Sequence, residues 1–113
     1  MADKLGKIQK LQEKKKVSKL CKFTTDGDPA VRAAAFLAIG ECGDTQEGNE
    51  ALQNSIRDPE PQVRLAIAKA FQKVGNDHVS EALHHQMLQE TDPALKTEFS
   101  KAMDFTRGRQ FGG

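Results

Sequence analysis

The sequence has no tryptophan, no tyrosine and only six phenylalanines, so aromatic residues make up just 5% of its 113 residues. β-Sheet cores favour aromatic and β-branched side chains. Alanine and other small aliphatic residues are common instead, and they permit close contact between helices. The composition therefore favours an all-helical fold, and the length suits one domain with a modest core.

Cysteine is scarce, and long apolar runs are absent. Cys21 and Cys42 are too few for a disulfide framework. On an antiparallel helix pair they would lie roughly 15 Å apart along the axis, whereas a disulfide needs Cα atoms within about 7 Å. No apolar run approaches the roughly 20 residues of a membrane span, and no apolar segment follows the basic N-terminus as in a signal peptide. We expect a cytoplasmic protein with reduced thiols.

The chain does contain a repeat with a period of 32 residues. An acidic residue followed by proline, and two residues later by an apolar and then a basic residue, occurs at 28–32, 60–64 and 92–96. The same register continues after each copy, where Ala38, Ala70 and Ala102 align. A period of this length, with a proline opening one helix of each unit, predicts an α-solenoid of about three helix pairs.

Helix boundaries follow from the same motif. Proline is tolerated at the first position of a helix, because that position has no intrahelical N–H bond to lose. Gly43 and Gly75 suit the left-handed caps that end helices. Together with the apolar stripes these signals predict seven helices, at about residues 2–12, 15–25, 29–42, 47–57, 61–74, 78–90 and 93–106.

These helices form a single expected domain over residues 1–106. Its repeats cover about 15–44, 45–76 and 77–106, and the helix at 2–12 caps the N-terminal end. Residues 107–113 are expected to be a disordered tail.

The string from Asp28 to Asp44 resembles the HEAT repeat, specifically its short bacterial variety known from phycobilisome (PBS) lyases, and the resemblance covers about residues 15–106. It implies an armadillo-like superhelix whose second helices line a concave face. It also implies that Arg32, Arg64 and Lys96 pair with acidic residues of neighbouring turns. Glu98 occupies a position that the family keeps small and apolar, which suggests the polar outer face of a terminal repeat. Proteins of this kind usually bind other proteins.

Three residues form a weak metal-site candidate. His78, Glu81 and His85 would span about 60° of one helix face, and imidazole with carboxylate can bind zinc. The simpler interpretation is a solvated helix face, and we expect no bound metal.

Catalytic motifs are absent from the sequence. Neither cysteine has a histidine near it in the chain, and there is no glycine-rich phosphate loop or Gly-x-Ser-x-Gly motif. We expect no catalytic residues, no enzyme activity and no cofactor.

Charge is distributed unevenly along the chain. Residues 1–25 carry eight lysines against two acidic residues, whereas residues 26–113 carry nine basic residues against fourteen acidic ones. The lysines include Lys14, Lys15 and Lys16, which could contact nucleic acid or another anionic surface. Against this, the cluster holds no arginine, tyrosine or tryptophan, which specific readers of nucleic acid favour.

A candidate partner-binding site lies on the helices that begin at the three prolines. Two positions of each repeat, expected to point into the concave groove, are occupied by Ala33 and Leu37, Leu65 and Lys69, and Thr97 and Lys101. Ala33, Leu37 and Leu65 would form an apolar patch with Lys69 and Lys101 at its rim, as partner sites often do. The alternative is that the superhelix twists enough to bury Leu37.

Two functions fit these observations. The first is a monomeric, non-catalytic scaffold that binds an unknown protein or peptide on the concave face. The second is an enzyme accessory of the bilin-lyase type, which would need a tetrapyrrole pocket that this short chain, without tyrosine or tryptophan, is poorly equipped to form.

Overall fold

A computed structural model describes residues 3–75 and 77–110, and within these residues the chain is helical and contains no strand. The elements are α1 (Asp3–Glu13), α2 (Val17–Cys21), the 3-10 helix η1 (Lys22–Thr25), α3 (Pro29–Glu41), α4 (Gln46–Asn54), α5 (Pro61–Ala70), α6 (Asp77–Gln89) and α7 (Pro93–Gln110). The all-helical solenoid is therefore confirmed. The expected second helix is instead a short α-helix that tightens into a 3-10 turn.

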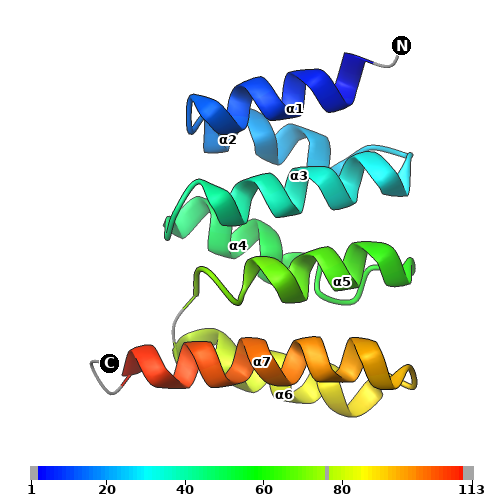
Figure 1. Ribbon diagram of the computed structural model, residues 1–113, viewed down its shortest axis with the longest axis vertical. Coiled ribbons are helices and arrows are strands. Elements are labelled where there is room, and N and C mark those ends of the chain that lie inside the picture. The colour runs from blue at the N-terminus through cyan, green and yellow to red at the C-terminus, as the bar shows by residue number, and fades with distance from the viewer. Residues whose placement is uncertain (1–2, 76, 111–113) are drawn as a thin grey trace.

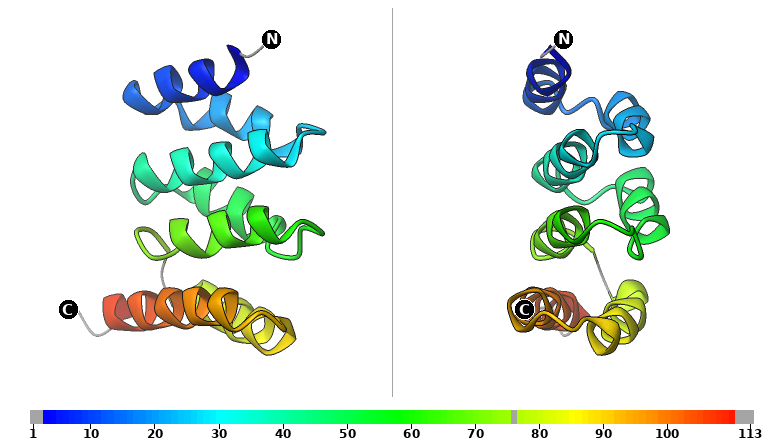
Figure 2. Two further views of the ribbon diagram at one scale, coloured as in Figure 1. Left: turned by 45° about the vertical axis from the view of Figure 1, so that its right-hand side comes forward. Right: turned by 90° about the vertical axis from the view of Figure 1, so that its right-hand side faces the viewer.

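The helices stack in two layers. The odd-numbered helices α1, α3, α5 and α7 form one layer, and α2 with η1, α4 and α6 form the other (Figures 1 and 2). The first and last helices lie at opposite ends of the stack, which measures 40 × 31 × 18 Å along its principal axes. Each helix pair therefore contacts only its neighbours, as in other repeat proteins.

The repeated motif positions the start of each odd-numbered helix. Pro29, Pro61 and Pro93 are the first residues of α3, α5 and α7. The Asp28 carboxylate caps α3 by accepting a hydrogen bond from the Ala30 N–H at 2.9 Å. Gly43 and Gly75 have φ angles of 102° and 107°, in the left-handed region that glycine adopts without steric cost.

Two arginines join the repeats. Arg32 donates from Nε and Nη2 to both carboxylate oxygens of Asp58, at 3.0 and 3.1 Å, and from Nη1 to the backbone oxygen of Asp26 at 2.9 Å. Arg64 repeats this arrangement one unit later, with Glu90 at 2.7 and 3.2 Å and the backbone oxygen of Asp58 at 2.8 Å. The pairing expected of Arg32 and Arg64 is confirmed.

Lysines occupy the position of Arg32 and Arg64 in the first and last odd-numbered helices, and only one of them forms an ion pair among the described residues. On α1, Lys4 donates to the Asp26 carboxylate at 2.7 Å and so takes the place of an arginine. On α7, Lys96 is exposed and forms no ion pair among the described residues. The expectation that Lys96 pairs with a neighbouring turn is wrong.

The interface between α3 and α5 is close-packed. Gly40 lies against Ala70, and a Cβ atom built on Gly40 would stand 2.8 Å from the Ala70 Cβ and 2.9 Å from the Ala70 Cα. Phe36, Ile39 and Ile67 are fully buried in the same core. This contact is possible only because both facing positions are nearly without side chains.

The interface between α5 and α7 is built differently, and it corrects the expected role of Glu98. One repeat further along the chain, Gln72 occupies the position of Gly40, and Glu98 occupies that of Ala66. The Gln72 amide donates to the Glu98 carboxylate at 2.8 Å and to the Glu98 backbone oxygen at 3.1 Å. Glu98 thus faces the preceding repeat, not the outer end. The outer end is made polar by Ser100 and Asp104, which are exposed where repeat one has Phe36 and Gly40.

The C-terminal boundary also differs from expectation. Helix α7 continues to Gln110, whereas we expected it to end at residue 106 and to be followed by a disordered tail. Residues 111–113, the rest of that tail, lie outside the described residues.

Replacement of glycine by alanine should have opposite effects on stability at positions 40 and 6. Gly40→Ala should lower the free energy of unfolding by about 1–2 kcal/mol, because overpacking outweighs the gain in helix propensity. Gly6→Ala is the matched control: nothing lies within 4 Å of the point where its Cβ atom would stand, so it should stabilise α1 by up to about 1 kcal/mol. Urea denaturation measures both, and equal shifts would show that α3 and α5 are not in close contact.

The ion pairs predict how stability falls in acid. Burial alone would raise the pKa of Asp58, but hydrogen bonds from Arg32 and the Glu60 N–H, with the arginine charges, hold its pKa below the ordinary value. Such a group stabilises the fold above its unfolded pKa of about 4, and this contribution is lost as pH falls through the lower folded pKa. Asp58→Asn should therefore destabilise the protein at neutral pH and less so near about pH 2.

Thermal midpoints measured from neutral to acid pH test this expectation. The exposed Asp104 offers a control, since Asp104→Asn removes a carboxylate that forms no ion pair among the described residues. If the two variants keep parallel pH profiles, the Arg32–Asp58 pair does not stabilise the stack.

Candidate functional site

The surface of α1, α3, α5 and α7 that faces away from the other layer is called here the odd-helix face. The four helices lie side by side in one layer (Figure 2). Because the arginine pairs recur with the same geometry, equivalent residues of successive helices are expected to align on this face. Neighbouring odd-numbered helices also pack more closely than α2, α4 and α6 do. That difference is expected on the inner side of a curved stack.

The five residues of the expected partner site share this face. Ala33 and Leu65 form one row with Thr97, and Leu37, Lys69 and Lys101 form the next. Leu37 is 42% exposed, so the alternative that neighbouring repeats bury it is wrong. Ala33 and Leu65 are half-buried against the core, and Lys69 and Lys101 are exposed. The register of the helices thus places the five residues on one face, and their role in binding a partner stays a prediction.

Leu5 extends the patch, and the sequence analysis missed it. Since Lys4 binds Asp26 as Arg32 binds Asp58, α1 is in register with α3 when Lys4 is aligned with Arg32. Leu5 then falls in the row of Ala33, and it is 51% exposed. The spacing of 28 residues instead of 32 concealed this match.

An apolar notch continues the patch towards α7. It lies between the first turns of α5 and α7, has a volume of about 150 Å³, and is lined by Pro61, Gln62, Leu65, Asp92, Ala94 and Leu95. Leu65 belongs both to the notch and to the row of Ala33. The apolar surface therefore crosses all four odd-numbered helices.

Lysines lie beside this apolar surface on α5 and α7. Lys69 forms no ion pair among the described residues, and the Lys101 ammonium is 3.5 Å from the Glu98 carboxylate. The hydrogen bond from Gln72, aided by the charge of Lys101, holds the pKa of Glu98 below its ordinary value. Lys73 pairs with Glu41 across α3 and α5. Lys69 and Lys101 thus supply positive charge next to Leu37 and Leu65.

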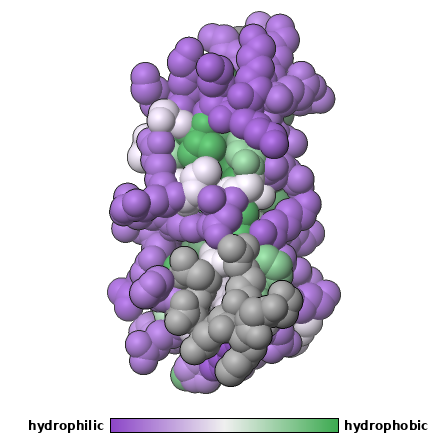
Figure 3. All heavy atoms as spheres, turned by 90° about the vertical axis from the view of Figure 1, so that its left-hand side faces the viewer, coloured by the Kyte–Doolittle hydropathy of each residue, from purple (hydrophilic) through white to green (hydrophobic). Residues whose placement is uncertain are grey.

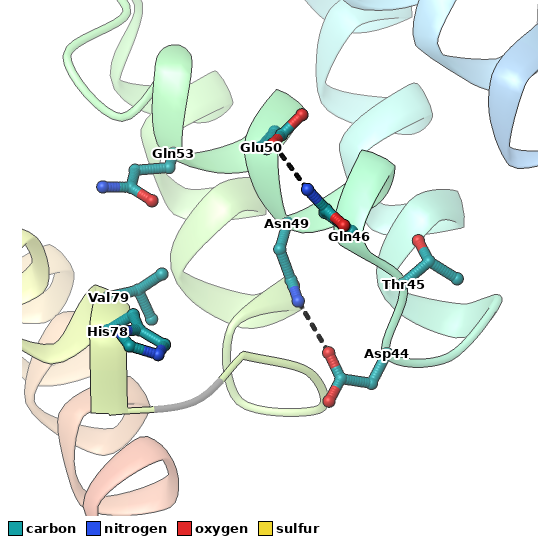
Figure 4. A pocket seen from close by; sticks show the side chains of 8 residues that line it. All are labelled: Asp44, Thr45, Gln46, Asn49, Glu50, Gln53, His78 and Val79. Atoms are coloured by element: carbon teal, nitrogen blue, oxygen red, sulfur yellow. Dashed lines mark hydrogen bonds between the residues drawn. The ribbon is translucent and has the colours of Figure 1, made fainter.

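A cleft lies in the other layer, between α4 and α6 (Figure 4). These two helices hardly touch, and the cleft of about 530 Å³ between them is lined by Asp44, Thr45, Gln46, Asn49, Glu50, Gln53, His78 and Val79. Asn49 donates to the Asp44 carboxylate at 2.6 Å, and Gln46 donates to Glu50 at 3.3 Å. Most of its side chains are polar, its two carboxylates are those of Asp44 and Glu50, and the sequence offered no signal for it.

The three residues of the metal candidate lie on one exposed side of α6. His78, Glu81 and His85 are exposed and line a neighbouring cavity of about 480 Å³. In the part of the chain that the structure describes, no three histidine, cysteine, aspartate or glutamate side chains are placed to hold a metal ion.

The two thiols are free and unsuited to attack. Cys42 is buried and Cys21 half-buried, and burial raises the pKa of both thiols above the ordinary value. They are therefore protonated at neutral pH, and a protonated thiol is a poor nucleophile.

The lysines of the N-terminal segment lie together at one end of the stack. Lys14, Lys15 and Lys16 are exposed at the turn between α1 and α2. On the side of the molecule shown in Figure 3, hydrophilic residues cover this end, and apolar residues are visible mainly further down the stack.

Comparison with known proteins gives one match. The sequence pattern of HEAT repeats matches residues 5–104. Comparisons with curated proteins and with solved structures gave no match. In the described residues no helix has the length and apolar character needed to cross a membrane. From the extent of the match and the paired-helix stack, the chain belongs to the HEAT repeat family.

Proposed function

We propose that this protein is a non-catalytic, monomeric interaction module of the cytoplasm that binds a segment of another protein on its odd-helix face. HEAT repeats generally mediate contacts between proteins. The observation that carries the proposal is the exposure of Leu37 at a position where the following repeats have lysine. The finer likeness to the short repeats of phycobilisome lyases is part of the same proposal.

The chemistry of the face indicates the character of the partner. Leu5, Leu37 and Leu65 would contact apolar side chains, and Lys69 and Lys101 would attract acidic ones. Exposed apolar patches with a polar rim are typical of binding sites. A segment lying along the stack would cross several helices and meet both kinds of surface, so an acidic segment with apolar anchors fits best.

Support for a non-catalytic role comes from the chemistry of the described side chains. Burial raises the pKa of both thiols, so they are protonated at neutral pH. In the cleft between α4 and α6, polar side chains form hydrogen bonds with one another, as Asn49 does with Asp44 and Gln46 with Glu50. The free cysteines also fit a reducing compartment.

Leu37→Glu tests the proposal. Loss of a buried anchor typically costs about 2 kcal/mol or more in binding free energy, so the variant should lose its partner in affinity capture from the native lysate. It should keep wild-type helicity, because glutamate is a good helix former at an exposed site. Circular dichroism and quantitative mass spectrometry of the captured proteins measure the two properties.

Leu88→Glu is the matched control. Leu88 is 63% exposed, but it lies on α6 in the other layer. This variant should retain every protein that the wild type captures. If both variants fold and capture the same proteins as the wild type, the partner binds elsewhere and the proposal is wrong; if Leu37→Glu unfolds, Leu37 belongs to the core.

A further inference from the structure

The N-terminal segment contains many more lysines than form ion pairs in the fold. Residues 3–25 contain eight lysines, and the ion pair of Lys4 with Asp26 joins α1 to the first repeat. The other seven are exposed and form no ion pair with any described residue: Lys7, Lys10, Lys14, Lys15, Lys16, Lys19 and Lys22. Their charges repel one another, so they cost stability in the isolated protein.

These lysines form one continuous surface, called here the basic end. Lys7, Lys10 and Lys14 fall within about 60° of one another around the axis of α1. Lys15 and Lys16 follow in the turn, Lys19 lies on α2, which packs beside α1, and Lys22 lies on η1, which continues α2 (Figure 1). The lysines are thus concentrated at the N-terminal end of the stack.

A lysine occupies position 15 although the backbone conformation there favours other residues. Its φ angle is 55°, in the left-handed region, and among the described residues it alone occupies this region without being glycine. Glycine or asparagine would suit that conformation better than lysine does. The turn therefore gains nothing in backbone energy from lysine, and what the residue does supply is a positive charge between two others.

The shape of the basic end limits the kind of ligand that fits it. A hollow of about 400 Å³ beside the turn is lined by Lys15, Lys16, Val17, Ser18, Lys19, Thr45 and Glu47. The one carboxylate in this lining accepts a hydrogen bond from Ser18 at 2.6 Å. A hollow bordered by lysines accommodates a protruding chain of phosphates better than it does the flat surface of a membrane.

We propose that the basic end binds the phosphate backbone of nucleic acid without reading its sequence. Lysines can neutralise phosphates one by one. The cluster has no arginine for paired contacts with base edges, and its one aromatic residue, Phe23, is half-buried and packed against the core. Within residues 3–25, Leu5 is the large apolar side chain that is exposed, and it faces the odd-helix side, away from these lysines.

Fluorescence anisotropy with a labelled DNA duplex of about 20 base pairs tests the proposal. We expect weak binding that falls steeply with salt. The logarithm of the association constant should change with the logarithm of salt concentration with a slope of about −4 for four or five phosphate contacts. A binding constant that does not change with salt would overturn the assignment.

Two variants locate the binding surface. Replacing Lys14, Lys15 and Lys16 together by glutamate should abolish binding to the duplex. Replacing Arg57, Lys96 and Arg107, which are exposed, by glutamate makes the same change in net charge away from the basic end and should leave most of the affinity. Equal loss in both triple variants would show an effect of net charge alone and would overturn the proposal.

Lys15→Gly separates charge from folding. Glycine removes one phosphate contact and suits the φ of 55°, so the affinity for the duplex should fall several-fold and the salt slope should become shallower by about 0.9. The thermal midpoint should not fall. Unchanged affinity in this variant would count against the proposal.

Two further probes distinguish other polyanions. Sedimentation with vesicles rich in phosphatidylserine tests a membrane, and competition with polyglutamate tests an acidic protein chain. Binding to either probe that is tighter than binding to the duplex would overturn the assignment to nucleic acid. Weaker binding to both supports it.

Discussion

Arg32 and Arg64 each bind two repeats at once, and the whole stack depends on this interaction. Each guanidinium donates to a backbone carbonyl of its own turn and, in two parallel bonds, to the carboxylate of the next turn. Paired bonds of this kind fix orientation as well as distance. Successive odd-numbered helices are thereby held in the same register, and residues 32 positions apart become neighbours on one surface. The rows of the odd-helix face are a direct consequence.

The arginines set the register, but the side chains between the helices set the spacing. Gly40 and Ala70 let α3 and α5 touch, whereas Gln72 and Glu98 stand between α5 and α7 and bond to each other. A large polar pair thus replaces a contact of small residues at one interface without leaving a polar group unpaired. In the other layer α4 and α6 hardly touch, and the polar cleft lies between them. The third repeat is accordingly attached to the rest chiefly through α7.

The sequence could predict what the repeat itself encodes. Proline starts, glycine stops, the Arg32 and Arg64 pairs and the rows of Leu37 and Leu65 all recur at fixed spacing, so local rules suffice for them. It could not predict the partner of Glu98, the alignment of Leu5 or the exposure of Leu37. Those depend on how one repeat sits on the next, and a pattern within one repeat carries little information about that geometry. The polar cleft depends on the same geometry.

The two ends of the described stack differ in charge. At the C-terminal end Lys96, Ser100 and Asp104 are exposed, and the charges of Lys96 and Asp104 cancel. The N-terminal end carries seven exposed lysines that form no ion pair with any described residue. An exposed helix face can thus be polar without a large excess of one charge, so polarity alone does not require so many lysines. The basic end and the odd-helix face share α1, where Leu5 lies about 140° or more around the helix axis from Lys7, Lys10 and Lys14, so substitutions on one side of α1 leave the side chains of the other side in place.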